Sequence, residues 1–295
     1  MLGKRKLSLG KNMKDISQED IQNNLKLVVA STGEFKVENK NFVLENNSFV
    51  VIGGPCRVES LEQMEASAKA IKANGLKFIR AGAFKPCTFP YASGGMGEGG
   101  LKILKEIADK YDLISVSEIM AVSQIDLGIK YVDVFQIGAR NMQNYNLLEA
   151  IGKTGKPVIL KRHPGSSLRD LLGAAEWLLT NGCKYLMVCE RGITVPYTHD
   201  VNARWLLDIQ IVPAIKRITK IPIVLDVSHS SGTRAFIPYL TTAVAGSGAD
   251  GLMIETHPEP DKSQSDKDQI IDFESFKQLT EKVKKITNVL DKKVV

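Results

Sequence analysis

From residue 49 onward, short apolar runs rich in β-branched side chains alternate with longer stretches whose apolar residues recur at helical spacing. The runs that we expect to be strands cover residues 49–53, 76–82, 113–118, 133–138, 157–162, 185–190, 222–228 and 251–255. The expected helices between them include residues 61–73, 100–110, 168–180 and 204–217. Strands that alternate with helices in this way predict a parallel sheet with helical crossovers.

Eight strand–helix units with no remainder favour a closed (β/α)8 barrel, the TIM barrel, over an open α/β sheet. The chain has 295 residues, of which 43% are hydrophobic, and this suits one such barrel. We expect residues 1–40 to form an N-terminal extension with a short helix at 17–27, capped by Ser17. Residues 41–295 would form a single barrel domain. The glycine-dense segment 94–100 is expected to be a mobile loop over the functional site of the barrel.

The bulk composition limits the classes of partner. A net charge of +6 at pH 7 could suit nucleic acid, but the basic residues are too dispersed to predict such binding. No run of about 18 apolar residues is present, so we expect no membrane span, and no apolar region follows the basic N-terminus to make a secretory signal. The cysteines lack CxxC spacing, which indicates reduced thiols in a cytoplasmic protein; they are Cys56, Cys87, Cys183 and Cys189.

Three expected strands lead into potential metal ligands. Cys56 follows the first strand, His229 follows the seventh, Glu255 ends the eighth, and Asp266 lies in the loop after it. In a parallel barrel the carboxyl ends of the strands line one face, where active sites are built. Each residue alone has an ordinary structural explanation, so the prediction depends on their shared placement. A thiolate, an imidazole and two carboxylates suit Mn, Fe, Co or Zn better than Mg.

Basic side chains end or closely follow the other strands. Arginine suits bidentate binding of phosphate or carboxylate, whereas lysine acts as a compact charge. Several cations in one cleft are costly without an anion, so the pattern predicts a substrate that carries more than one negative charge. The alternative is ion pairing with carboxylates such as Glu59 or Glu118. The basic set comprises Arg80, Lys85, Arg140, Lys161, Arg162 and Arg191.

Long motifs in the same order along the chain carry a family resemblance. They are Gly54-Pro55-Cys56-Arg57-Val58-Glu59-Ser60, Ala83-Phe84-Lys85-Pro86, Gln136-Ile137-Gly138-Ala139-Arg140-Asn141-Met142-Gln143-Asn144, Leu160-Lys161-Arg162, Cys189-Glu190-Arg191-Gly192, Ser228-His229, Glu255-Thr256-His257-Pro258 and Ser265-Asp266. Over roughly residues 40 to 288 the sequence resembles 3-deoxy-D-arabino-heptulosonate-7-phosphate (DAHP) synthases of the compact type I-beta group. These are relatives of 3-deoxy-manno-octulosonate-8-phosphate synthase.

The resemblance implies condensation of phosphoenolpyruvate with a phosphorylated aldose, most simply erythrose 4-phosphate, in aromatic amino acid biosynthesis. It implies a divalent metal held by Cys56, His229, Glu255 and Asp266. It also implies that Lys85 transfers a proton, with a pKa that nearby cations could depress, and that the chain forms a homodimer or homotetramer. The substrate-binding residues implied are Arg80, Lys85, Pro86, Thr88, Arg140, Lys161, Arg191 and Arg234.

The chain departs from the family pattern around the second substrate. The family reads Lys-Pro-Arg-Thr-Ser where this chain reads Lys85-Pro86-Cys87-Thr88-Phe89, and the missing arginine is the expected ligand of the acceptor phosphate. We therefore expect the reaction type to persist, with either a different aldehyde or erythrose 4-phosphate held by a compensating cation such as Arg234 or His163. Rival interpretations are a metal-dependent hydrolase or lyase on the same barrel, and a sensor that binds phosphoenolpyruvate without turnover.

Overall fold

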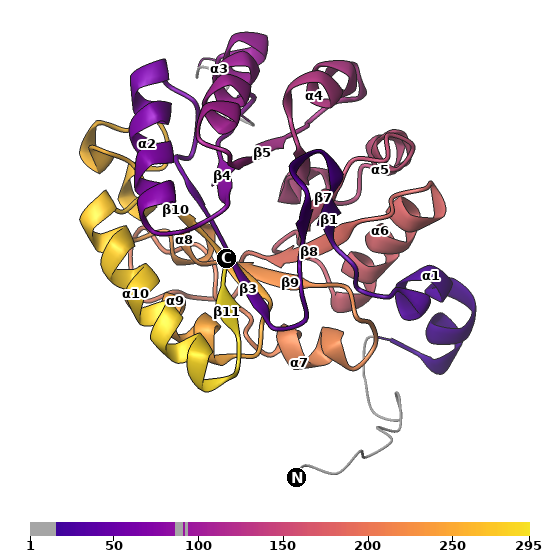
Figure 1. The fold of residues 1–295 in the computed structure, drawn as a ribbon. Coiled ribbons are helices and arrows are strands. Elements are labelled where there is room, and N and C mark those ends of the chain that lie inside the picture. The colour runs from indigo at the N-terminus through magenta and orange to yellow at the C-terminus, as the bar shows by residue number, and fades with distance from the viewer. Residues whose placement is uncertain (1–15, 86–90, 92–93) are drawn as a thin grey trace.

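The structure, a computed structural model, describes residues 16–85, 91 and 94–295. Eight parallel strands follow one another around a closed barrel (Figure 1). The last of them pairs with the first, from Gly251 opposite Val50 to Glu255 opposite Gly54, which closes the barrel and confirms the predicted architecture. The strands are β3 (Ser48–Gly54), β4 (Phe78–Arg80), β5 (Ile114–Glu118), β6 (Val134–Ile137), β7 (Val158–Lys161), β8 (Leu186–Glu190), β9 (Ile223–Asp226) and β10 (Gly251–Glu255).

Helices surround the barrel and connect its strands. Side-chain caps define where several of them begin: the Ser60 hydroxyl accepts a hydrogen bond from the Gln63 amide, and Ser167 and Asp170 form a capping box. The α-helices are α2 (Leu61–Ala73), α3 (Gly97–Lys110), α4 (Ile125–Tyr131), α5 (Tyr145–Gly152), α6 (Leu168–Thr180), α7 (Ile211–Lys216), α8 (Val227–Ser231), α9 (Ile237–Gly246) and α10 (Phe273–Val289). Short 3₁₀ turns occupy Val122–Gln124, Ala139–Asn141, Pro260–Lys262 and Lys267–Gln269.

The core has two layers because successive strand side chains point to opposite faces. In β3, Val50 and Ile52 belong to the cluster inside the barrel, whereas Phe49 and Val51 pack in the layer under the helices. The hairpin of β1 (Lys36–Val37) and β2 (Phe42–Val43) supplies apolar side chains to the inner cluster. It therefore covers the amino-terminal end of the barrel, the end that faces the viewer in Figure 1. The 3₁₀ turn Glu38–Lys40 joins its strands.

The N-terminal segment folds against the outside of the barrel. Ser17 accepts a hydrogen bond from the Asp20 amide, as expected of a cap, but the predicted single helix is divided into a π-helix (Asp20–Asn24) and α1 (Lys26–Ala30). The Glu176 carboxylate on α6 accepts hydrogen bonds from the first turn of α1. The domain boundary at residues 40 and 41 stays a prediction. The short strand β11 (Lys293–Val294) pairs with the start of β3.

Two other predicted elements were wrong in part. The helix expected over 204–217 begins only at Ile211, because Leu206 pairs with Ile193 in an antiparallel bridge that keeps the preceding chain extended. The glycine-dense segment 94–100 is not wholly a loop, because its last four residues form the first turn of α3. Pro86, Cys87 and Thr88 lie outside the described residues.

Candidate active site

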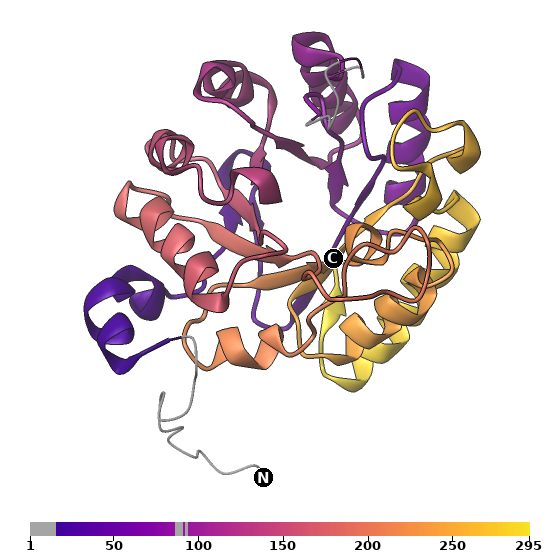
Figure 2. The same cartoon turned by 180° about the vertical axis from the view of Figure 1, so that it is seen from behind.

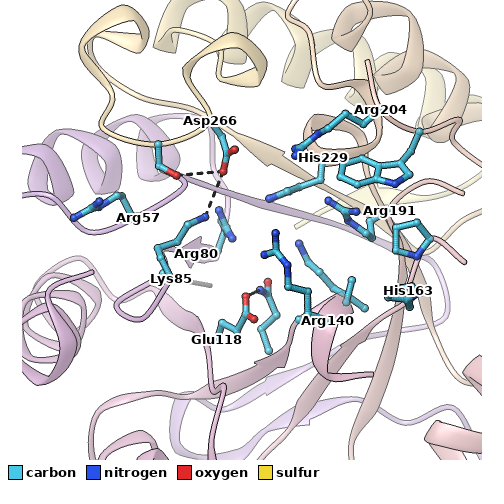
Figure 3. Close-up of a pocket in the computed structure, with 18 of the residues that line it drawn as sticks. Arg57, Arg80, Lys85, Glu118, Arg140, His163, Arg191, Arg204, His229 and Asp266 are labelled. Atoms are coloured by element: carbon cyan, nitrogen blue, oxygen red, sulfur yellow. Dashed lines mark hydrogen bonds and ion pairs between the residues drawn. The ribbon is translucent and has the colours of Figure 1, made fainter. Parts of the chain in front are cut away.

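A cavity of about 760 Å³ opens among the loops at the carboxyl ends of the barrel strands. Figure 2 shows this end of the molecule, and Figure 3 shows the side chains of the cavity. Its charged and imidazole side chains come from strands and loops all around the barrel. They are Arg57, Arg80, Lys85, Glu118, Arg140, Lys161, His163, Arg191, Arg204, His229 and Asp266.

The backbone at the end of β3 turns so that Cys56 lies at the carboxyl end of the barrel. Gly54 has a φ of +136°, and a Cβ there would lie 2.2 Å from the carbonyl oxygen of Arg80. Only glycine fits this close approach of β3 to β4. The Arg80 guanidinium then donates to the carbonyl oxygens of Pro55 (3.2 Å) and Cys56 (3.4 Å), which fixes the turn that carries the thiol.

The four predicted metal ligands come together at this end of the barrel. One donor atom from each of Cys56, His229, Glu255 and Asp266 lies within 4.8 Å of all the others. The Cys56 thiol donates to Asp266 Oδ2 at 3.0 Å, and His229 Nε2 lies 3.6 Å from Glu255 Oε1. One sulfur, one imidazole nitrogen and two carboxylate oxygens converging in this way fit a divalent first-row ion.

Groups behind these side chains hold them in place. Asp226, at the end of β9, is fully buried and accepts hydrogen bonds from the His229 backbone amide (2.9 Å) and from its ring Nδ1 (2.8 Å). This leaves His229 Nε2 as the ring nitrogen that faces the cluster. Glu255 is fixed in the same way by Arg80 at 2.5 Å and by the Gln269 amide at 2.8 Å. Sequence reasoning gave Asp226 no role, although it lies three residues before His229.

Burial and nearby charges set the protonation of the site. Burial, reinforced by the Glu255 charge, raises the pKa of the Cys56 thiol to about 12 in the metal-free protein. Burial also lowers the pKa of His229, although Asp226 opposes that shift. For Lys85, burial favours the neutral amine, but Cys56 and Asp266 outweigh it and the pKa is raised. The prediction of a depressed Lys85 pKa was therefore wrong.

The predicted basic residues divide into groups with different surroundings. Arg80, Lys85 and Lys161 each pair with an acidic side chain of the site: Glu255 at 2.5 Å, Asp266 at 3.4 Å and Asp226 at 2.5 Å. Arg140 and Arg191 also line the cavity.

Two other predicted arginines are not among the residues that line this cavity. Arg162 is bound by Glu190 (3.0 Å) and Asp208 (2.9 Å). Arg234 pairs with Asp261 at 2.8 Å and donates to two backbone carbonyls of the loop after β10. Arg162 thus serves the scaffold, and Arg234 holds the loop that carries Asp266.

Glu118, at the end of β5, brings a further carboxylate to the cavity wall. Its Oε2 accepts a hydrogen bond from the Gln136 amide at 3.2 Å, and its buried Oε1 has no hydrogen-bond partner among the described residues. A Cβ at Gly138 would lie 2.0 Å from Oε1, so glycine is required to admit this carboxylate. The sequence suggested Glu118 only as a partner in ion pairs. This oxygen is therefore available to a ligand in the cavity.

Comparison with known proteins agrees with this geometry. The sequence model of the DAHP synthetase I family matches residues 34–292. The chain belongs to this family. It is 41% identical over 249 residues to phospho-2-dehydro-3-deoxyheptonate aldolase of Thermotoga maritima, an alignment that covers 84% of this chain and 73% of that protein. It is 30% identical over 246 residues to 2-dehydro-3-deoxyphosphooctonate aldolase of Francisella tularensis subsp. holarctica, covering 77% and 87% of the two chains.

Solved structures of the DAHP synthetase I family superpose closely on this fold. The crystal structure of the Thermotoga maritima DAHP synthase matches with a TM-score of 0.84 and 38% identity, over 90% of this chain and 76% of that one. A truncated form of the same enzyme matches with a TM-score of 0.79 and 39% identity, over 86% and 92% of the chains. The predicted family and TIM barrel are confirmed, and with them a phosphoenolpyruvate-dependent synthase. The family is metal-dependent, and the structure has a matching group of candidate ligands. Among the described residues, no helix is long and apolar enough to cross a membrane.

Proposed function

We propose that this enzyme condenses phosphoenolpyruvate with a phosphorylated aldose and releases inorganic phosphate, and that erythrose 4-phosphate is the first acceptor to test. The convergence of Cys56, His229, Glu255 and Asp266 beside a cavity lined with cations carries this proposal. A site for carbonyl activation next to a site for a multiply charged anion is what such a condensation needs. The DAHP synthases among its relatives support the choice of acceptor.

The ligand set would hold Mn, Fe, Co or Zn, because a thiolate and an imidazole favour ions of intermediate softness. A bound divalent ion would supply polarisation of the aldehyde carbonyl. Asp226 would fix the tautomer of His229, and the Arg80 and Gln269 contacts would keep Glu255 oriented.

The cations would hold phosphoenolpyruvate with its C3 carbon facing the aldehyde. Arg80, Lys85, Arg140, Lys161 and Arg191 would bind its carboxylate and phosphate groups. C3 forms a bond to the aldehyde carbon, positive charge develops at C2, water adds to C2, and the bond from C2 to the phosphate oxygen breaks.

Two side chains would transfer the protons in this reaction. Lys85 Nζ lies 2.8 Å from Cys56 Sγ, and its raised pKa keeps it protonated, so it would donate to the new hydroxyl. We assign Glu118 Oε1 as the acceptor for a proton of the attacking water, because this oxygen has no other partner among the described residues.

Phosphate release by purified enzyme, with phosphoenolpyruvate, Mn²⁺ and a panel of aldehydes, tests the proposal. The panel contains erythrose 4-phosphate, arabinose 5-phosphate and their unphosphorylated forms. We expect release only when phosphoenolpyruvate, metal and an aldehyde are all present, and Cys56→Ala serves as the matched inactive control. Release from phosphoenolpyruvate without aldehyde would favour the hydrolase interpretation, and tight binding with no release would favour the sensor.

A second candidate is the same reaction with another aldehyde, because Cys87 stands where the family has its acceptor-phosphate arginine. Arabinose 5-phosphate turnover that exceeds turnover of erythrose 4-phosphate would support it. We also propose a cytoplasmic homodimer or homotetramer built on a barrel domain from residue 41, with residues 1–40 as an extension.

A further inference from the structure

The loop after β8 forms a closed structure at the rim of the cavity. The Ile193 and Leu206 backbones exchange two hydrogen bonds, of 2.9 and 3.0 Å, at the base of the loop. The Thr194 amide donates to the Pro164 carbonyl at 2.9 Å, which ties the loop to the segment after β7. Within the loop, the Thr198 hydroxyl donates to the Ala203 carbonyl at 2.7 Å. These bonds fix the chain immediately before the bridge, where Arg204 and Trp205 lie.

Trp205 stacks on two arginines. The guanidinium carbon of Arg191 lies 4.0 Å from the centre of the Trp205 ring, and that of Arg204 lies 4.3 Å from it. Trp205 therefore packs against both guanidinium groups. Each interaction is attractive, because the faces of an indole are electron-rich. Gly192 permits the arrangement, since a Cβ there would lie 2.6 Å from the Trp205 Cβ.

Both stacked arginines line the cavity, and Figure 3 shows their side chains directed into it. Arg80, Lys85 and Lys161 each have a carboxylate partner in the site. Arg191 and Arg204, in contrast, form no ion pair with any carboxylate in the part of the chain that the structure describes. Arg191 is buried and Arg204 is exposed at the rim. Two cations without carboxylate partners on one cavity wall favour the binding of anionic ligands.

The contact with Trp205 determines how these anions can be bound. Because the indole ring packs against each guanidinium group, the N–H groups at the edges of the two arginines remain for anions, and two arginines can bind two anionic groups. A condensation of two phosphorylated substrates brings two such groups into one cavity. Arg191 and Arg140 both line the cavity and both belong to the cations that we assign to phosphoenolpyruvate, so we assign this side to its phosphate.

We propose that Arg204, held by Trp205, binds the terminal phosphate of the aldehyde substrate, and that Trp205 is a positioning residue for both arginines. This inference rests on the proposed function and adds the residue that binds the phosphate of the acceptor. It also supplies a cation from the loop after β8 in a chain that has Cys87 where the family has its acceptor-phosphate arginine. The acceptor phosphate would then be bound by the loop after β8, beside Trp205.

Steady-state kinetics of Arg204→Gln test the assignment. We expect the KM for erythrose 4-phosphate to rise about tenfold or more, because a charge-assisted contact is lost. The KM for phosphoenolpyruvate and the KM for unphosphorylated erythrose should change less than about twofold. Arg57→Gln, which removes another arginine from the cavity wall, is the matched control and should keep the preference for the phosphorylated aldehyde. The assignment is overturned if Arg204→Gln keeps that preference.

Trp205 variants separate positioning from folding. Trp205→Leu should raise the KM values of both substrates, whereas Trp205→Phe, which keeps an aromatic face, should restore most of the affinity. Equal defects in kcat for both variants, with unchanged KM values, would contradict a positioning role.

A binding measurement distinguishes failure of this inference from failure of the proposed reaction. The chain has two tryptophans, so Trp177→Phe leaves Trp205 as the single indole reporter. We expect erythrose 4-phosphate to change its fluorescence saturably, and Arg204→Gln to abolish this response while the response to phosphoenolpyruvate remains. If that pattern holds but no phosphate is released, the anion site stands and the proposed reaction fails. If turnover occurs and neither KM nor fluorescence depends on Arg204, the inference fails and the reaction stands.

Discussion

Replacing Asp226 with asparagine tests how the protein controls its metal ligands. The substitution keeps the size of the side chain and an oxygen that can accept from the His229 amide, now 2.9 Å away. It removes the negative charge that faces His229 Nδ1 at 2.8 Å and Lys161 Nζ at 2.5 Å. His229 then loses the partner that fixes its tautomer, and Lys161, which is only 3% exposed, keeps a buried charge without its carboxylate.

The expected size of the effect follows from these contacts. Loss of a carboxylate behind a ligating histidine lowers metal affinity by about 10- to 100-fold, which is about 1.4 to 2.7 kcal/mol. Removing one partner of a buried ion pair costs about 3–5 kcal/mol of unfolding free energy. Asparagine keeps part of the hydrogen bonding, so we expect the lower end of that range.

Competition with a fluorescent chelator measures the metal affinity, and urea unfolding with and without Mn²⁺ measures the stability. Asp208→Asn is the matched control, because Asp208 pairs with Arg162 at 2.9 Å away from the ligand cluster. The control should bind metal normally. Wild-type affinity for Mn²⁺ in Asp226→Asn, in a protein of normal fold, would refute the role that we assign to Asp226.

Three further predictions concern the same site. Because the pKa of the metal-free Cys56 thiol is about 12, ion binding at pH 7.5 should release about one proton, measured by calorimetry in buffers of different ionisation enthalpy; His229, with its lowered pKa, contributes none, and release near zero would contradict thiolate ligation. Cys56→Ser should fold normally but bind the softer ions Zn²⁺ and Co²⁺ about 10-fold or more weakly, with a smaller loss for Mn²⁺, in the same chelator assay. Gly138→Ala should displace the Glu118 carboxylate, which a Cβ would approach to 2.0 Å, and lower kcat for phosphate release at least about 10-fold, whereas Gly99→Ala, where a Cβ meets open space, should not.

The barrel and its ligand set could be predicted from the sequence because both depend on local patterns. Apolar runs mark the strands, and parallel strands bring the residues that follow them to one rim, so Cys56, His229 and Glu255 meet although they are far apart in the chain. Asp266 was included because it lies in the loop after Glu255, and the family resemblance supported that choice, since a charged loop gives no direct sign of where its side chains point.

Features that depend on tertiary contacts escaped prediction. The helical pattern of residues 204–217 is overridden at its start by hydrogen bonds between Ile193 and Leu206, so the stack on Trp205 had no sequence signal. The pKa of Lys85 was misjudged for a similar reason. The sequence suggested that other cations of the site would surround Lys85. In the structure its ammonium group instead donates to the Cys56 sulfur and the Asp266 carboxylate.

The pairing of substrate cations with metal-site acids predicts that metal and phosphoenolpyruvate bind cooperatively. Arg80 and Lys85 are neutralised in part by Glu255 and Asp266, two of the candidate ligands. An ion of charge two that displaces one proton from Cys56 adds one net positive charge to the site and draws those carboxylates toward itself. The positive charge of Arg80 and Lys85 is then neutralised less by these carboxylates, so the two cations attract an anion more strongly. Mn²⁺ should therefore tighten phosphoenolpyruvate binding by about 5- to 150-fold, the usual range of coupling between sites. By linkage, phosphoenolpyruvate must tighten Mn²⁺ binding by the same factor, and calorimetry in both orders measures it. Equal affinities with and without metal would show that the two sites are electrostatically independent despite their shared carboxylates.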